Sequence, residues 1–280
     1  MRIHHLNCGS HCPLGGAIFD GASHGLFAHG VTHCLLVETG SGLVLVDTGY
    51  GLEDVRHPRS RLAWTWPTVL NAQLSEADTA LRQIEALGFS AEDVRHIVLT
   101  HLDFDHAGGI EDFPHARVHV MERERDVAER KRRGFVTRQR YRPLQWDSVR
   151  DWRTYSADGE PWFGFEAVRD LDGLSPEILL VPLAGHTVGH AGVAIATPQG
   201  WLLHAGDAYL HHEQMDIGHP RCPWGLAIYE RIMDTDRSAR AANQERLRQL
   251  KRQHADTVAV FCSHDARELD AALNSVPGSA

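Results

Sequence analysis

The sequence contains few cysteines, no long apolar run and no excess of basic residues. Its five cysteines include no C-x-x-C motif, and this odd number argues against a disulfide framework and against a four-cysteine zinc site. No apolar run approaches the roughly 20 residues that cross a bilayer. The opening residues MRIHHLNCGS lack the basic and then apolar pattern of a secretory signal. These absences predict a cytoplasmic protein without membrane contact.

The charge balance favours a small-molecule substrate over a nucleic acid. The chain carries 28 Lys and Arg against 37 Asp and Glu, which gives a formal net charge of -9. Nucleic-acid binding draws on a basic surface, which this balance does not predict. At 280 residues and 42% hydrophobic content the chain can bury a large core. We expect a single domain over residues 1–280.

Apolar patterning in the first half predicts a hairpin, a helix and a strand. Residues 33–38 and 42–47 are short apolar runs joined by a glycine turn, which is typical of a β-hairpin. In the next periodic segment Ser75 can cap a helix that ends at Gly88. Residues 94–100 follow as a buried strand. The earlier segment CGSHCP, with Cys8 and Cys12, is interpreted as a polar turn, with metal binding as the alternative.

The second half predicts further strands, together with a long insertion. Residues 134–170 have little periodicity but many aromatic side chains, and we interpret them as an insertion that covers a site. Helices are expected at 122–133, over roughly 225–254 and at the end of the chain. The predicted strands are 116–121, 177–183, 191–197, 201–207 and 257–265. This order predicts an α/β fold with two β-rich halves faced by helices.

The segment 100–109, THLDFDHAGG, concentrates side chains that bind metals. His101, Asp103, Asp105 and His106 fall within six positions, and two glycines then leave room for close backbone approach. Alternate side chains of an extended segment point the same way, so the first three can face one side. Carboxylates this close repel unless a cation lies between them. The segment therefore predicts one or two divalent metals, and these ligands suit zinc, manganese or iron.

Similar residues follow other predicted strands. His186 and His190 lie in GHTVGH, directly after the strand at 177–183. Asp207 and His264 each stand at the end of a later apolar run. Side chains at strand ends can converge on one ligand from distant parts of a sheet.

These motifs together resemble the metallo-β-lactamase-fold hydrolase superfamily, whose signature is HxHxDH followed by a distant His, Asp and His. The matching pieces are HLDFDH, GHTVGH, GD and SH, with LVDTG as an early strand-end aspartate. They span nearly the whole chain. The resemblance implies a four-layer αβ/βα sandwich with metals in a cleft at one edge of two sheets.

The resemblance also implies two divalent metal ions, with zinc as the expected metal. The ligands of the first ion would be His101, Asp103 and His186. The ligands of the second would be Asp105, His106 and His264, with Asp207 bridging the two ions. Asp47 and His190 are expected to orient these ligands without binding the metals themselves.

Asp103 departs from the family pattern, because most members have histidine there. The carboxylate makes the first site more negative and brings it closer to the two-histidine, one-glutamate sites of zinc hydrolases. Flavodiiron oxidoreductases of the superfamily carry glutamate at this position and bind iron. Iron and manganese therefore stay open as alternatives to zinc.

The expected reaction is hydrolysis of a lactone or ester. A hydroxide bridging two metals would attack the substrate carbonyl. The candidate catalytic residues are Asp105, as a metal ligand, and Tyr209, as a donor to the developing oxyanion or leaving group. Phe104, the loop at 50–74 and the 134–170 insertion would supply an aromatic wall suited to an acyl substrate. By analogy, lactonases that open acyl-homoserine lactones, and related esterases, are nearest in layout.

Three other functions stay open. A thioesterase of the glyoxalase II type would use the same metals. A phosphodiesterase or nuclease would fit the basic run at 123–142, but acidic residues interleave its first half, which favours a solvated helix face. A metal-binding sensor would keep the ligands and lack turnover. The apolar residues of 50–74 also hint at a homodimer.

Overall fold

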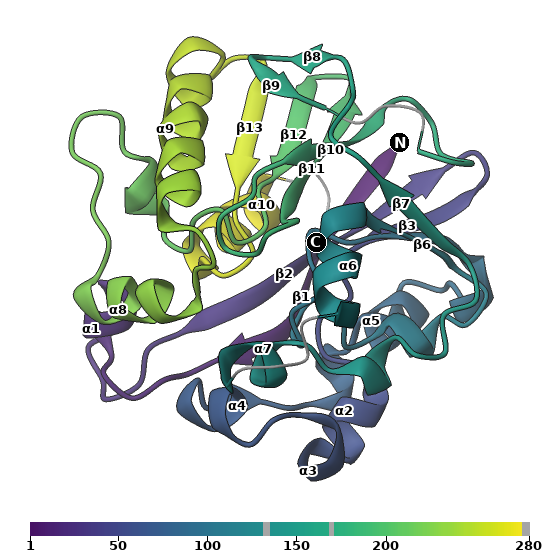
Figure 1. The fold of residues 1–280 in the computed structure, drawn as a ribbon, viewed down its shortest axis with the longest axis horizontal. Helices are drawn as coiled ribbons and strands as arrows, with labels where there is room; N and C mark the ends of the chain where they lie inside the picture. Colours follow the sequence, from purple (N-terminus) through teal and green to yellow (C-terminus); the bar gives the residue numbers. More distant parts are fainter. Residues whose placement is uncertain (131–134, 168–170, 276–280) are drawn as a thin grey trace.

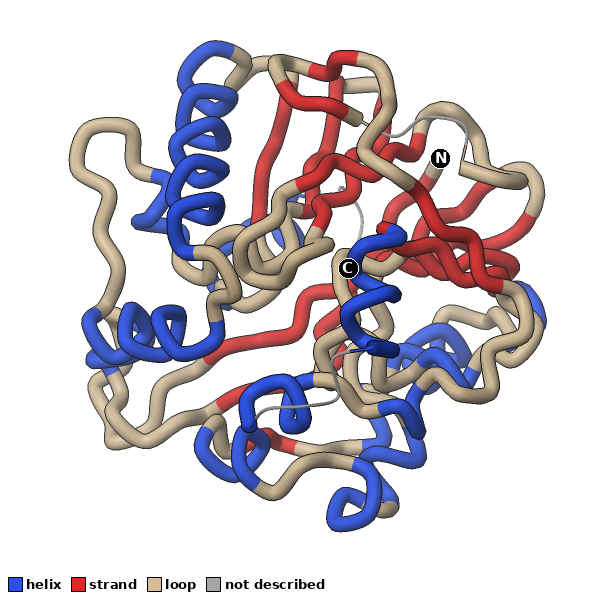
Figure 2. The backbone as a smooth tube through the Cα atoms, viewed as in Figure 1, coloured by secondary structure: helices blue, strands red, loops and turns tan. Residues whose placement is uncertain are grey.

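A computed structural model describes residues 1–130, 135–167 and 171–275. Two mixed β-sheets lie face to face, and helices cover the outer face of each (Figure 1, Figure 2). The architecture is thus the four-layer αβ/βα sandwich that the family resemblance implies.

The first sheet has seven strands, and the predicted hairpin lies at its centre. Its strands, in spatial order, are β4 (Ala72–Gln73), β1 (Arg2–His11), β2 (Gly30–Thr39), β3 (Gly42–Val46), β5 (Val94–Val98), β6 (Arg117–Met121) and β7 (Trp152–Tyr155). Strands β2 and β3 pair antiparallel, which confirms the hairpin, and β3, β5, β6 and β7 run parallel.

The second sheet has four strands in sequential order. They are β10 (Ile178–Pro182), β11 (Ala191–Thr197), β12 (Gly200–His204) and β13 (Val258–Phe261). A separate two-stranded ribbon consists of β8 (Pro161–Trp162) and β9 (Phe165–Glu166).

Alternating side chains of β2 explain why the first sheet is covered on both faces. Neighbouring residues of a strand point to opposite faces. Cys34 and Leu36 pack outward in the cluster that contains Ile84 of the helix α5 (Ala80–Ala86). Leu35 and Val37 pack inward against the second sheet. Because both faces are apolar, the sequence of this strand is a continuous hydrophobic run.

Strand β10 divides its side chains in the same way on the other side of the interface. Ile178 and Leu180 belong to the cluster between the two sheets. Leu179 and Val181 pack outward in the cluster that contains Leu247 of α9 (Arg237–Gln253). The core therefore consists of apolar layers on both sides of each sheet.

The remaining helices lie outside or below the sheets (Figure 1). Their bounds are α1 (Ala17–Asp20), α2 (Leu52–Arg56), α3 (Pro58–Arg61), α4 (Thr65–Val69), α6 (Glu122–Arg130), α7 (Phe135–Arg140), α8 (Trp224–Met233) and α10 (Ala266–Ser275). The predicted helix over 225–254 is two helices, because the backbone is extended at Asp234 and Asp236.

The helix predicted from Ser75 begins later than expected. A short 3-10 turn, Glu76–Asp78, precedes α5, and the side chain of Thr79 accepts a hydrogen bond from Arg82 N. Thr79 is therefore the N-cap, because its hydroxyl satisfies an amide of the first helical turn. Gly88 follows the end of the helix with φ of 89°, as a helix terminator does.

Two segments contain more regular structure than their sequences indicate. The first residues form β1, a strand with mostly polar, half-buried side chains, and not a turn. The predicted loop at 134–170 contains α7 and β7, and β7 pairs with β6 at the sheet edge. Residues 131–134 and 168–170 of these predictions lie outside the described residues.

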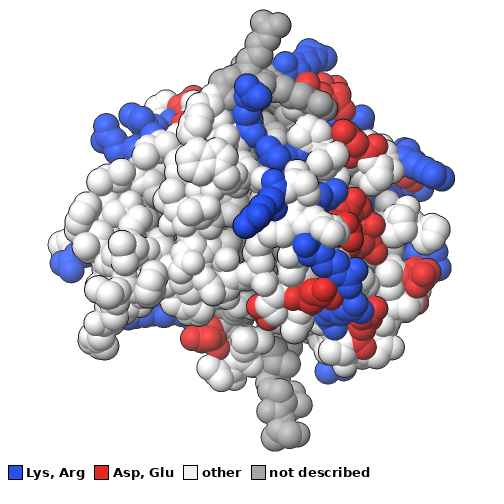
Figure 3. All heavy atoms as spheres, turned by 90° about the horizontal axis from the view of Figure 1, so that it is seen from below, with Lys and Arg blue, Asp and Glu red and all other residues white. Residues whose placement is uncertain are grey.

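One face of the molecule separates charged from uncharged surface. Figure 3 shows Lys, Arg, Asp and Glu gathered on one side and a broad area with few charged side chains on the other. Trp224, Ile228 and Ile232 of α8 are exposed. The homodimer remains a prediction. Within the described ranges, no helix is both long enough and apolar enough to cross a membrane.

Candidate metal centre

Strands from both sheets direct their ends to one edge of the sandwich. Strand β12 is parallel to β13, and both β10 and β12 are antiparallel to β11. Strands β10, β12 and β13 therefore end at the same edge. The segment after β5 meets them there, because Ala191 N donates to Thr100 O at 2.9 Å. The strand-end motifs of the sequence are therefore brought together.

The first cluster contains His101, Asp103 and His186. Asp103 Oδ2 lies 3.4 Å from His101 Nε2 and 3.0 Å from His186 Nε2. All three side chains are buried. Donor atoms that share one tetrahedral zinc ion lie roughly 3.4 Å apart. The spacing of this cluster therefore suits a single ion.

The second cluster contains Asp105, His106 and His264, with Asp207 between the two clusters. His106 Nε2 lies 3.4 Å from Asp207 Oδ1, and His264 Nε2 lies 3.2 Å from Asp207 Oδ2. Asp105 Oδ2 is 3.8 Å from His264 Nε2. Asp207 Oδ2 is also 3.5 Å from His186 Nε2, so this carboxylate contacts both clusters.

Hydrogen bonds at the Nδ1 atoms fix the orientation of two imidazole rings whose Nε2 atoms face the centre. His264 Nδ1 donates to Val31 O at 2.7 Å. His101 Nδ1 lies 2.9 Å from Thr100 Oγ1 and must donate, because that hydroxyl already donates to a carboxylate. The Nε2 lone pairs of both rings are left to face the centre, as in the histidine ligands of metal sites.

Asp47 supports the centre from the end of the hairpin. It is fully buried, and its backbone has φ of 54°, a left-handed conformation that side chains other than glycine rarely adopt. Its carboxylate accepts hydrogen bonds from His106 Nδ1 at 2.8 Å and from both Thr100 N and Thr100 Oγ1. Asp47 thus lies behind a predicted ligand, as the sequence indicates.

His190 supports the centre from the other sheet. Its Nδ1 donates to Leu183 O at 3.0 Å, which leaves Nε2 to accept from Asp207 N at 2.9 Å. Burial and the neighbouring His101 lower the pKa of His190 well below its usual value. A neutral His190 therefore holds the backbone of the carboxylate that joins the two clusters.

The buried centre requires positive charge. Burial opposes a charge on His106, but Asp207 and Asp47 raise the pKa of His106 to about 10. Burial would also raise the pKa of Asp207, but His264 and His106 hold it well below its usual range. Ionised carboxylates at this depth need cations beside them.

The residues present fit divalent metal ions. His101 Nε2 and Asp207 Oδ1 are buried, and neither has a hydrogen-bond partner among the described residues. Such atoms are rare unless a ligand or ion satisfies them. Three sets of donor atoms lie within 4.8 Å of one another, namely His101, Asp103 and His186; His101, His106 and Asp207; and His11, Asp105 and His264.

Glu124 at the start of α6 joins the two segments that carry the first cluster. It is buried and accepts hydrogen bonds from Leu102 N at 3.1 Å, Thr187 Oγ1 at 2.6 Å and Gly189 N at 3.1 Å. Tyr141 also donates to it at 3.2 Å. The role of Glu124 was not predicted from the sequence, because its charged helix is typical of a solvated face.

The structure does not place Tyr209 in the centre. Tyr209 is fully buried beneath α10, and its hydroxyl donates to the carboxylate of Glu268 at 3.0 Å. The residue does not line the cavity beside the centre. The predicted role of Tyr209 as a donor to substrate is therefore wrong, because its proton is committed elsewhere.

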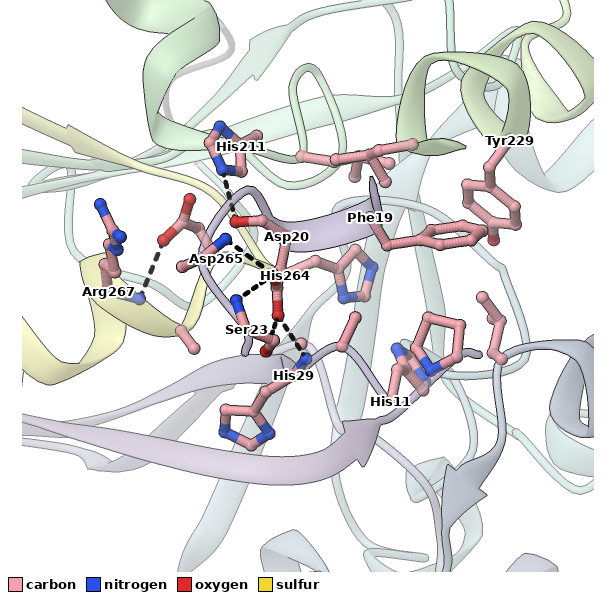
Figure 4. Close-up of a pocket in the computed structure, with 18 of the residues that line it drawn as sticks. His11, Phe19, Asp20, Ser23, His29, His211, Tyr229, His264, Asp265 and Arg267 are labelled. Carbon is pink, nitrogen blue, oxygen red and sulfur yellow. Dashed lines mark hydrogen bonds between the residues drawn. The ribbon is translucent and has the colours of Figure 1, made fainter. Parts of the chain in front are cut away.

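A cavity of about 340 Å³ opens onto the centre at His11, Asp105 and His264 (Figure 4). Its apolar lining comes from the segment between β1 and β2, from the end of α4, from the loop after β12 and from α8, and includes Phe19, Ala28, Leu70, Leu210 and Leu226. Polar residues on another part of the wall include Asp20, Ser23 and Arg267.

The predicted aromatic wall is not what lines this cavity. Trp64 is exposed, and Phe104 is buried outside it. Trp66 packs edge-on against the ring of Tyr229. From 50–74 only Leu70 reaches the cavity, and no described residue of the insertion does. The aromatic side chains of these segments mostly fill local cores.

Two residues beside the centre escaped the sequence analysis. His11, at the end of β1, lies with its Nε2 3.6 Å from Asp105 Oδ2 and 3.0 Å from the hydroxyl of Tyr50. Tyr229 of α8 lines the cavity, and its hydroxyl has no hydrogen-bond partner among the described residues. Burial and the carboxylate of Asp105 raise its pKa well above the usual value. Neither residue belongs to a motif.

A further group, His211, His212 and Asp265, does not need an ion. His211 Nε2 donates to Asp20 O at 3.1 Å (Figure 4), and His212 Nδ1 donates to Asp265 at 2.7 Å. These hydrogen bonds already satisfy the group. All five cysteines are free thiols, and none belongs to a cluster of potential metal ligands within the described residues.

Comparisons with known proteins agree with this geometry. A family model described as the metallo-beta-lactamase superfamily matches residues 29–264. A Mycobacterium tuberculosis protein named a probable metallo-hydrolase is 41% identical over 271 residues, which cover 95% of this chain and 80% of that protein.

Solved structures with the same fold are more distant in sequence. An N-acyl homoserine lactone hydrolase with the product N-hexanoyl-L-homoserine at its catalytic metal centre is 21% identical, with a TM-score of 0.69 over 96% of this chain and 95% of that one. A dizinc quorum-quenching lactonase is 19% identical, with a TM-score of 0.60 over 94% and 86% of the two chains. On the family match and the mycobacterial relative, both spanning most of the sequence, the chain belongs to the metallo-beta-lactamase superfamily.

Proposed function

We propose that the protein is a metal-dependent hydrolase that opens lactones or cleaves related carboxylic esters. The observation that carries the proposal is the cavity, which is largely apolar and ends at Asp105 and His264 of the candidate centre. An acyl chain can occupy the apolar part while a carbonyl group reaches the centre.

The ligand set of the proposal is the one that the family resemblance implies. His101, Asp103 and His186 would hold the first divalent ion, and Asp105, His106 and His264 the second, with Asp207 shared. When bound, two such ions supply a water activated at neutral pH and polarise a substrate carbonyl. Zinc is the expected metal, with iron or manganese as alternatives.

The protein's own residues would orient the substrate and exclude water from it. Phe19, Leu210 and Leu226 offer contacts to an acyl chain, and their burial of that chain removes apolar surface from water. Tyr229 presents an uncommitted hydroxyl to the same cavity. This hydroxyl would donate a hydrogen bond to the carbonyl oxygen or to the leaving oxygen.

The support for lactones over other substrates comes from the cavity chemistry and from the solved relatives. Among the described residues that line the cavity, Arg267 is the only Lys or Arg. It lies near Asp265 and His212. A phosphodiester would favour more cationic groups. The N-acyl homoserine lactone hydrolase of similar fold has its product, N-hexanoyl-L-homoserine, bound at its catalytic metal centre.

The test follows acid release at constant pH. Purified protein receives N-hexanoyl homoserine lactone or an aryl ester, with and without a chelator, and in parallel as the Asp207→Asn variant. Ring opening or ester cleavage releases one proton per turnover at neutral pH. We expect acid release that the chelator abolishes and that D207N lowers by about 100-fold or more, because the shared carboxylate is lost while its shape is kept.

Silence on lactones and esters, from protein shown to hold two metals, would contradict the substrate class. Thioesters and phosphodiesters then become the next substrates, for the thioesterase and phosphodiesterase alternatives. Silence on all four classes would favour a metal-binding sensor.

A further inference from the structure

A buried arginine lies beside the first cluster of the candidate centre. Arg140, the last residue of α7, is 2% exposed. Its Nη1 donates to His186 O at 2.9 Å, and its Nη2 donates to Met233 O at 2.8 Å. Its Nε lies 3.0 Å from Asp103 Oδ1. The two groups form an ion pair, but the geometry at Nε is not that of a hydrogen bond. The insertion thus delivers a cation to the first cluster.

The two oxygens of Asp103 face different partners. Oδ1 faces Arg140 Nε, whereas Oδ2 faces His101 Nε2 at 3.4 Å and His186 Nε2 at 3.0 Å. Arg140 Nη2 also lies 3.4 Å from His186 Nε2, so the guanidinium borders the cluster itself. One carboxylate can therefore bind an ion on one side and an arginine on the other. Two backbone carbonyls hold Arg140 in place, so the guanidinium can fix the orientation of the carboxylate.

The charges of this pair explain how an aspartate can stand at this position. Histidine, which the motif usually has there, is a neutral ligand. Asp103 adds one negative charge to the centre, and Arg140 adds one positive charge beside it. A buried guanidinium or carboxylate that has lost its partner strongly destabilises the folded protein. Each residue therefore offsets the buried charge of the other.

We infer that Asp103 and Arg140 act as one neutral unit that replaces a histidine ligand at the first metal, with Arg140 as a positioning residue for Asp103. The inference rests on the proposed metal centre and extends it to a residue outside the motif. It predicts that changing either residue alone weakens metal binding at the first site, whereas changing both together largely preserves it.

The test is a double-mutant cycle read by metal binding. The variants are Asp103→His, Arg140→Met and the double variant D103H/R140M. The control is Arg142→Met, alone and combined with D103H, because Arg142 lies nearby in the chain and bonds to Arg61 O instead of to Asp103. Each protein is stripped, dialysed against buffered zinc, and measured for zinc per chain, for zinc affinity by chelator competition and for melting temperature.

We expect R140M to weaken the binding of the first zinc by about 10- to 100-fold, as outer-shell changes at metal sites do. D103H should lose about one zinc per chain, because an unpaired guanidinium then faces that ion. In the D103H background, R140M should restore binding to within about 10-fold of the parent. The effect of R140M therefore changes sign between the two backgrounds, while R142M has little effect in either.

Three results would overturn the inference. R140M could lower affinity equally in both backgrounds, D103H could bind two zinc ions as the parent does, or R142M could rescue as well as R140M. If D103H does not fold, a folded double variant with two zinc ions supports the unit, and a double variant with one or none overturns it. A parent protein that binds two zinc ions but cleaves no lactone or ester contradicts only the proposed substrate. A parent that binds no metal contradicts both proposals.

Discussion

Asp47 illustrates how single residues hold the centre together. Its left-handed backbone costs of the order of 1–3 kcal/mol for a residue other than glycine. Three hydrogen bonds to its carboxylate, from His106 and Thr100, keep it in this conformation. The conformation places the carboxylate behind the ring of His106, where it sets which ring nitrogen faces the metal site.

At the residue scale, the two tyrosines near the centre should behave differently. Tyr229→Phe should lower kcat for lactone opening by about 10- to 100-fold, because it removes a hydroxyl that faces the cavity. Tyr209→Phe serves as its matched control and should leave kcat unchanged, since that hydroxyl bonds to Glu268. Steady-state kinetics of the two variants checks this. Equal losses of kcat in both variants, or no loss in Y229F, would remove Tyr229 from the proposed mechanism.

The motif residues could be placed from the sequence, but their neighbours could not. Strand-end spacing indicates that His101, Asp103 and His186 converge, because strand order and side-chain alternation are regular. His11 and Arg140 reach the same place through β1 and α7, whose polar sequences give no periodic signal. What brings them there is tertiary packing, which local patterns do not record.

At the scale of elements, the turn from β3 to α2 packs against the metal-binding segment. A Cβ on Gly108 would lie 2.4 Å from Asp54 Oδ2 and 2.6 Å from Gly49 O, so only glycine fits this approach. Asp112 joins the same region, because its carboxylate accepts from Leu52 N at 3.0 Å. Burial and the nearby Glu111 raise the pKa of Asp112 to about 7.

This carboxylate should make stability depend on pH. The folded-state pKa of about 7 lies above the unfolded value near 3.9, so the folded chain binds more protons between these values and stability falls as pH rises through them. Asp112→Asn should therefore stabilise the protein by about 1–2 kcal/mol more at pH 8 than at pH 5, after allowance for partial exposure. Urea unfolding at both pH values measures the difference.

Glu92→Gln removes one exposed carboxylate and controls for net charge in that experiment. A D112N gain that is the same at both pH values would show that Asp112 is ionised throughout this range in the folded protein.

Element type was easier to predict than element boundaries. The apolar runs of β2, β3 and β10 are continuous because both faces of each sheet are covered, and such runs are visible in the sequence. The start of α5 depends on one hydroxyl of Thr79, and the break between α8 and α9 depends on a short extended stretch. Competing caps one turn apart, such as Ser75, look alike in sequence.

At the scale of the whole molecule, the sandwich places its chemistry where the two sheets meet. Three strands of the second sheet end beside the segment that follows β5, so ligands far apart in sequence lie in one buried cluster. The cavity then forms between the segment after β1 and the loop after β12. The fold could be predicted from the strand-end motifs, whereas the cavity wall depends on how long irregular segments pack.

The most direct test of this account is to titrate metal-free protein with zinc, manganese or iron(II) while recording bound metal per chain and the rate of lactone opening. The account predicts two ions per chain and a rate that appears only as the sites fill, with the D207N variant failing in both respects. Full lactone opening by the metal-free protein would contradict the account. So would a protein that binds no metal even at the highest metal concentration.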